Sequence, residues 1–254
     1  MRPGGLFLFG IAFGVLAVGC GRAPGYPPNP MMRPTQIGDF ATLYSRNCAA
    51  CHGSNGRNGP AIDLANPEYQ ALVDDAALRK WISGGMPGTE MTAFAQSEGG
   101  MLTAAQIDAL VAGMRKQWWR PNAFGGVTPP PYAQPANGDS AHGQQVYVDR
   151  CAHCHQAQDQ DITSPGYLAL LSDQALRSII IAGRPDIGQM DWRMERGPAG
   201  VAGQLSSNSS SEFVHPLSAQ DVTDIVAYLD RLRNASSTAQ NTNTAPAPSG
   251  QTGR

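Results

Sequence analysis

The stretch NCAACHGSNG, residues 47–56, places two cysteines and a histidine within five positions. The stretch RCAHCHQAQD, residues 150–159, repeats this Cys-x-x-Cys-His pattern later in the chain. The residues of the two motifs are Cys48, Cys51 and His52, and Cys151, Cys154 and His155. Because self-similarity within one chain is the signature of duplicated structural units, we expect two copies of one unit, each built around its own motif.

The sequence around the two motifs repeats as well. An offset of 98 residues aligns DDAALRKWISGGMP, which begins at Asp74, with SDQALRSIIIAGRP, which begins at Ser172. Each copy then closes with a helical pattern of apolar residues, for which Thr103 and Ser218 are the predicted N-caps. Since no convincing period-2 strand pattern is visible, we predict an all-α, loop-rich fold made of two small tandem helical domains.

Composition divides the chain into successive segments. We predict a signal peptide over residues 1–19, a Pro-rich tether over 20–37, a first domain over 38–120, a Pro/Gly-rich linker over 121–137, a second domain over 138–232, and a disordered tail over 233–254. The second domain carries an insertion at about residues 195–216, which we interpret as a surface loop.

The N-terminus has the pattern of a targeting segment. Residues 6–19 are an apolar run, shorter than the roughly 20 residues that a membrane-spanning helix needs, and they suit the apolar core of a signal peptide. The run ends in LAVGC, which resembles the lipobox of bacterial lipoproteins and implies that Cys20 is lipidated. An ordinary cleaved signal, or an uncleaved anchor with an incidental Cys20, remains the alternative. The expected location is the bacterial cell envelope, anchored by lipid on the periplasmic side.

Four chemistries use paired cysteines at this spacing. A thioredoxin-type dithiol needs a strand and helix context that the sequence lacks, and a zinc site usually has its ligand pairs closer together in the chain. A disulfide leaves the histidine after each pair unexplained. Covalent attachment of haem c explains all three residues, because the thiols add to the porphyrin vinyl groups and the histidine supplies the proximal imidazole. We therefore predict two covalently bound haem c groups.

The loop before the last helix of the first unit supplies candidates for the sixth iron ligand. A methionine thioether favours ferrous iron and raises its reduction potential. The stretch GGMPGTEMTAF contains Met86 and Met91, and MTAF is similar to the Met-Pro-Ala-Phe-like stretch of class I cytochromes c. This resemblance implies that the domains are class I cytochrome c-like, that Met91 is the axial ligand, and that Met86 is a packing residue.

The corresponding loop of the second unit is less regular. The stretch GRPDIGQMDWR resembles the Gly-Arg-Pro-Asp-Leu-Gly-Met-Pro-Asp-Trp stretch of related diheme cytochromes. In a gapless alignment, Gln189 stands where that methionine stands, and the next residue is Met190. We predict Met190 as the axial ligand of the second haem. Ligation by Met194, or a weakly ligated second haem, is the alternative.

The resemblance implies a membrane-tethered diheme cytochrome that passes electrons between redox proteins. The second unit is similar to diheme lipoprotein cytochromes that accompany quinol-oxidising complexes of the cytochrome bc type, which favours a respiratory role. The formal net charge is only −2, so the composition gives no sign of nucleic-acid binding and no strong electrostatic docking partner.

Two other functions are compatible with haem binding. A diheme enzyme, either a peroxidase or a sulfur-compound dehydrogenase, would use a second iron left open or weakly ligated by Gln189. The mature chain is short for the peroxidase class, and it has no further cysteine for the ligation used by the dehydrogenases. A haem-based gas sensor would need a signalling module, and the sequence shows none. An electron carrier, with no catalytic residues, is therefore the favoured interpretation.

Overall fold

The computed structural model describes residues 32–134, 137–155, 161–193 and 216–242. The predicted signal peptide, Cys20, most of the tether, nearly all of the insertion, Met194 and the chain from residue 243 onward lie outside these ranges. The chain from Thr35 onward forms one compact unit, which contains both predicted domains. No helix in the described ranges combines the length and the apolar character needed to cross a bilayer.

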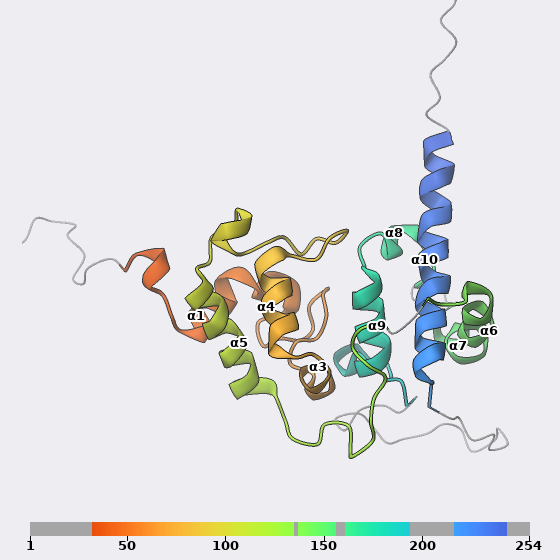
Figure 1. Ribbon diagram of the computed structural model, residues 1–254, viewed down its shortest axis with the longest axis horizontal. Helices are drawn as coiled ribbons and strands as arrows, with labels where there is room; N and C mark the ends of the chain where they lie inside the picture. The colour runs from red at the N-terminus through yellow and green to blue at the C-terminus, as the bar shows by residue number, and fades with distance from the viewer. Residues whose placement is uncertain (1–31, 135–136, 156–160, 194–215, 243–254) are drawn as a thin grey trace, which may run out of the picture. The chain divides into compact units, whose positions relative to one another are not determined.

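The first domain is built from short helices joined by loops (Figure 1). Its elements are η1 (Pro34–Gln36), α1 (Phe40–Asn47), α2 (Ala49–His52), α3 (Pro67–Leu72), α4 (Asp75–Gly84), η2 (Gln96–Glu98) and α5 (Ala104–Trp118). As predicted, Thr103 caps α5: its side chain accepts from the Gln106 amide, and the Gln106 side chain accepts from the Thr103 amide. This reciprocal pair satisfies backbone donors that the first turn of a helix leaves unpaired.

The second domain repeats this order. Its elements are α6 (Ser140–Arg150), α7 (Ala152–His155), α8 (Pro165–Leu168), α9 (Asp173–Ala182), η3 (Pro185–Ile187) and α10 (Ala219–Thr242). Ser218 accepts from the Asp221 amide at the start of α10, so this predicted cap is also confirmed. Within the described ranges the only β-type pairings are two isolated bridges, Ala95 with Leu102 and Arg184 with Gln189. The all-α prediction is confirmed.

The last helix is longer than predicted. We placed the end of the second domain at residue 232 and a disordered tail after it, but α10 continues to Thr242. The first proline after this helix is Pro246, and no glycine interrupts the stretch, so nothing in the sequence breaks the backbone hydrogen bonds before that point. The side chain of Asn234 also bonds back to Asp230 one turn earlier.

The core of the first domain lies where α1 packs against α5. A Cβ atom placed on Gly113 would lie 2.2 Å from the ring of Phe40, so glycine allows the two helices to approach closely. The ring of Tyr44 packs edge-on to Trp118, with centroids 5.2 Å apart. Tyr44 is thus a buried packing residue between the first and last helices.

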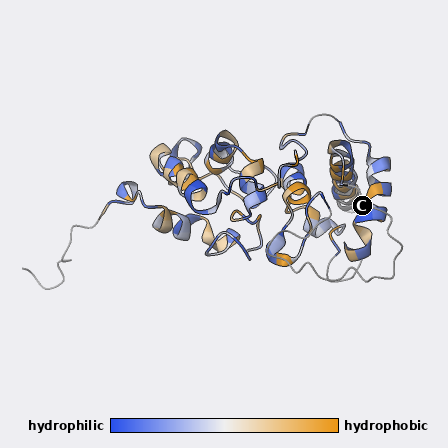
Figure 2. Ribbon diagram, turned by 90° about the horizontal axis from the view of Figure 1, so that it is seen from below, coloured by the Kyte–Doolittle hydropathy of each residue, from blue (hydrophilic) through white to orange (hydrophobic). Residues whose placement is uncertain are grey.

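The core of the second domain lies where α6 packs against α10. Here the close approach is at Gly143, whose added Cβ would lie 1.9 Å from the carbonyl oxygen of Asp224. Tyr147 is buried and packs on Tyr228, with centroids 5.4 Å apart. The helices carry both hydrophobic and hydrophilic residues (Figure 2), and the apolar side chains of α1, α5, α6 and α10 contribute to the two cores.

The predicted linker takes part in both cores. Phe124 is buried among the apolar side chains of the second domain. Tyr132 packs against the first domain, where its hydroxyl accepts a 2.7 Å hydrogen bond from the indole of Trp81. The carbonyl of Tyr132 in turn accepts from Gln174 of α9, so this segment is a packed connection rather than a loose spacer.

Candidate haem sites

The first motif is held on a single helical turn. Cys48 ends α1 and begins α2, and its amide donates to the carbonyl of Tyr44 at 2.9 Å. The amide of His52 donates to the carbonyl of Cys48 at 3.0 Å, so the turn gathers both cysteines and the histidine. Both thiols are free; Cys51 is exposed, and burial raises the pKa of Cys48 to about 12. The arrangement presents two unpaired thiols beside one imidazole, which is the donor set of a haem c site.

The imidazole of His52 is oriented by the loop that follows it. Its Nδ1 atom donates a 2.8 Å hydrogen bond to the carbonyl of Ile62, which fixes the tautomer and leaves the Nε2 lone pair for a metal. Burial lowers the pKa of His52, which keeps the ring neutral as metal binding requires. The hydroxyl of Tyr44 donates to the carbonyl of Gly53 at 2.9 Å and fixes the next residue. Sequence reasoning could not find Ile62, because any residue supplies a carbonyl.

The second motif has the same local construction. The amide of Cys151 donates to the carbonyl of Tyr147 at 2.8 Å, and the amide of His155 donates to the carbonyl of Cys151 at 3.0 Å. Cys154 is exposed, and burial raises the pKa of Cys151 to about 11. The second chain segment therefore also fits covalent attachment of haem c.

The two histidines differ in their side-chain partners. The Nε2 atom of His155 lies 2.9 Å from the Oε1 atom of Gln189, and because an amide oxygen only accepts, the imidazole donates in this contact. The Gln189 amide nitrogen donates to the carbonyl of Met190 at 3.1 Å. Sequence alignment singled out Gln189 as irregular, but it did not predict that its side chain would reach the histidine of the motif.

The loops with the predicted sixth ligands share one register. The amide of Met86 donates to the carbonyl of Met91 at 2.9 Å, and the amide of Arg184 donates to the carbonyl of Gln189 at 3.1 Å. Met91 and Gln189 are therefore equivalent positions, and Met190 takes the place of Thr92. Met91 is partly buried and packs against the first core. The assignments of Met91 and Met190 as iron ligands stay predictions.

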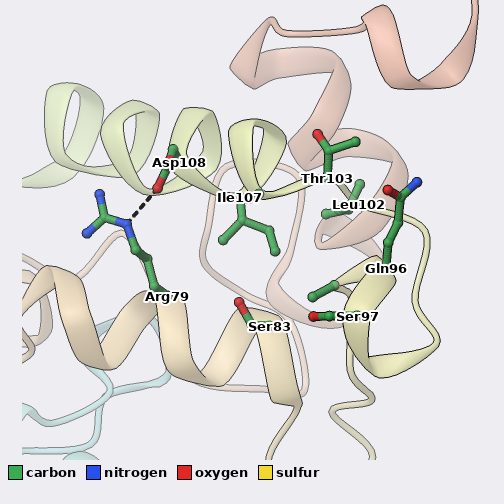
Figure 3. A pocket seen from close by; sticks show the side chains of 10 residues that line it. Arg79, Ser83, Gln96, Ser97, Leu102, Thr103, Ile107 and Asp108 are labelled. Atoms are coloured by element: carbon green, nitrogen blue, oxygen red, sulfur yellow. Dashed lines mark hydrogen bonds and ion pairs between the residues drawn. The ribbon is translucent and has the colours of Figure 1, made fainter.

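A shallow pocket of the first domain is separate from the motif. It lies between α4 and α5, and Figure 3 shows Arg79 at its edge, where the guanidinium bonds to Asp108 at 2.6 Å. The described lining contains none of the motif cysteines or histidines. The aligned arginine of the second domain, Arg177, is fully buried and donates to Pro131 and Thr223.

Comparison with known proteins identifies the class. The cytochrome c family matches residues 40–118 and 140–233, which together make up more than half of the chain. The chain belongs to the cytochrome c family. With one family domain around each motif, it is a diheme c-type cytochrome with two covalently bound haem c groups.

The chain is also similar to individual proteins of known function. The chain is 26% identical over 188 residues to the Cbb3-type cytochrome c oxidase subunit FixP of Rhizobium etli, covering 70% of this chain and 54% of that protein. It is 28% identical over 168 residues to the Cbb3-type cytochrome c oxidase subunit CcoP of an Azospirillum species, covering 59% and 46%. The chain thus spans about half the length of the curated relatives it matches. These relatives support the coarse assignment of an electron-transfer cytochrome.

Proposed function

We propose that this protein is a membrane-tethered electron relay of a respiratory chain, which accepts an electron at one haem and releases it from the other. The observation that carries the proposal is the presence of two Cys-x-x-Cys-His turns within one compact unit. Each bound haem c supplies an iron that changes between the ferrous and ferric states. The chain's own residues would attach the haems through the paired cysteines, and the carbonyl of Ile62 would orient the imidazole of His52.

The proposed roles follow the geometry of the two motifs. Cys48 and Cys51, and Cys151 and Cys154, would hold the two haems through thioether bonds, and His52 and His155 would each supply an imidazole nitrogen to the iron. Met91 is the proposed sixth ligand of the first haem. For the second haem the sequence predicts Met190, and the loop register supports the alternative of a weakly ligated iron.

The relatives favour a terminal oxidase as the electron acceptor, because both are named as subunits of a cbb3-type cytochrome c oxidase. The sequence resemblance favours a quinol-oxidising complex of the cytochrome bc type as the donor or host complex. Both are proposals for redox-protein partners. Co-purification from detergent-solubilised native membranes distinguishes them, since it should recover oxidase or quinol-oxidising subunits. Recovery of neither contradicts the respiratory partner.

The proposed location depends on Cys20 and the apolar residues 6–19. Lipid on Cys20 would hold the chain at the periplasmic side of a membrane. Replacing Cys20 with serine should abolish incorporation of labelled fatty acid and release the cytochrome into the soluble periplasmic fraction. An unchanged membrane fraction would contradict the lipid anchor.

Haem content tests the basis of the function. The full chain, produced in a host competent for cytochrome maturation, should yield a pyridine haemochrome equivalent to two haems per chain. The double variant Cys48→Ser/Cys51→Ser and its match Cys151→Ser/Cys154→Ser should each retain one covalent haem by mass spectrometry. A wild-type mass without haem would overturn the proposed function.

A further inference from the structure

The loops at Gly85 and Gly183 hold the candidate sixth-ligand positions, Met91 and Gln189, in the same backbone register. Both glycines have φ of 70°, and a Cβ on either would collide with the carbonyl of the residue six positions later, at 2.6 Å from Met91 and at 2.9 Å from Gln189. The loop of the second domain is therefore not shifted by one residue. The position that holds a thioether in the first domain holds a carboxamide in the second.

The side chain of Gln189 points at the nitrogen of His155 to which an iron would bind. Its Oε1 atom lies 2.9 Å from Nε2 of His155, whose amide is bonded to Cys151 within the motif turn. A metal bound to Nε2 would take the place of this hydrogen bond, and Gln189 would be the side chain left beside that metal. The carbonyl of Met190 accepts from the same carboxamide and holds it in this direction.

The chemistry of a carboxamide differs from that of a thioether. Thioether sulfur is a soft ligand that suits ferrous iron, whereas an amide oxygen is a hard, neutral donor that binds it weakly. The carboxamide also carries an N–H donor that can bond to a ligand held on the metal. A ferrous iron with one imidazole and a facing carboxamide therefore has a replaceable sixth position.

We propose that the second haem site is a binding site for a small exogenous ligand, a neutral diatomic of the carbon monoxide type, with Gln189 as the residue facing it. This inference rests on the proposed function, since it requires a haem at both motifs. The first site, with Met91 in the equivalent position, is closed to such ligands.

The test is spectroscopic and uses the full diheme protein. Titration of the reduced protein with carbon monoxide should saturate at one molecule per two haems. The oxidised protein should show the weak far-red charge-transfer band of methionine ligation with the intensity of one haem, not two. Carbon monoxide binding to neither haem, or a band equivalent to two methionine-ligated haems, would overturn the inference.

Three variants assign the residues. Gln189→Met should double the far-red band and abolish carbon monoxide binding, and Met190→Leu should change neither quantity. Met91→Gln should remove the band and raise the stoichiometry to two molecules per chain. A Met190→Leu variant that loses half of the band would assign the ligand to Met190 and refute the role of Gln189. The pyridine haemochrome of each protein is measured in parallel: fewer than two haems in the wild type contradicts the proposed function itself, whereas two haems with no ligand binding contradicts only this inference.

Discussion

In the first domain the first and last helices approach each other most closely at Gly113, which lies in the last helix. In the second domain the close approach is at Gly143, which lies in the first helix. The neighbours differ as well: Gly113 meets the ring of Phe40, and Gly143 meets the backbone of α10 at Asp224. The two domains thus reach the same helix crossing with the small residue on opposite partners. Close packing requires a glycine on one of the two helices at the contact, and either helix can supply it.

Other contacts are the same in both domains. Arg115 of α5 bonds to Asp75 at 2.7 Å, and Arg233 of α10 bonds to Asp173 at 2.5 Å, so each last helix is joined to the start of the preceding long helix. The loops between them diverge. Met86 of the first domain accepts from the hydroxyl of Ser172, while its counterpart Arg184 forms a buried ion pair.

The largest expected effect comes from making the two loops alike. Arg184 pairs with Asp186 at 2.8 Å and donates to the carbonyl of Gly59 in the first domain. In Arg184→Met, which copies the first domain, Asp186 keeps a buried charge with only the backbone amide of Asn58 as a partner, and the free energy of unfolding should fall by about 3–5 kcal/mol. Urea denaturation of the diheme protein measures this. The control Arg184→Met/Asp186→Asn should recover part of the loss; no recovery would show that the buried charge is not the cause.

The next largest effect on stability should come from replacing Gly143 or Gly113, the glycines at the two helix contacts. In Gly143→Ala the new methyl meets backbone, so the helices must separate, and we expect a loss of about 3 kcal/mol. In Gly113→Ala the methyl meets the ring of Phe40, which can rotate, and also the Cβ atom of Phe40 at 2.6 Å, which moves only with the backbone of α1. We therefore expect a smaller loss than for Gly143→Ala, of about 2 kcal/mol. Thermal unfolding of the two variants ranks them. Equal losses would mean that both crossings relax in the same way.

Replacement of the aligned residues Arg79 and Arg177 should change stability by different amounts, because only Arg177 is buried. Arg177→Ala leaves a cavity and removes the bonds to the Pro131 carbonyl and the Thr223 hydroxyl, which should cost about 2 kcal/mol. Arg79→Ala breaks only an exposed ion pair with Asp108 (Figure 3), so little change in stability is expected. Denaturation midpoints of the two variants, measured side by side, would contradict this if Arg79→Ala were the more damaging.

The smallest effect is a dependence of stability on pH that arises from His142 in the second domain. A hydrogen bond from His142 to the buried Asp224, 2.7 Å long, raises the pKa of His142, and Asp221 and Asp139 add to this effect. Because the folded-state pKa lies above the ordinary value of 6.5, the stabilisation is complete below that pH and is lost as the pH rises through the raised pKa. His142→Gln should flatten this part of the profile of melting temperature against pH. Parallel profiles for the wild type and the variant would exclude the contribution.

The parts of the site set by local spacing could be predicted from the sequence. Two cysteines and a histidine on one helical turn are fixed by their separation, and caps such as Thr103 depend on residues three positions away. The contact of Gln189 with His155 could not be predicted, because it depends on how a distant loop packs on α7. Likewise Arg79 and Arg177 occupy aligned positions, and only the packing of the connection around Pro131 explains why the second is buried.

The packed connection between the domains has a consequence for modularity. Phe124 fills the core of the second domain, and Tyr132 is bonded to α4 through Trp81 and to α9 through Gln174. A cut near residue 120 would leave Phe124 with the second domain but would separate Tyr132 from the first domain, against which it packs. The two domains therefore depend on the same connecting segment. Either domain produced alone must include this segment to keep its core covered.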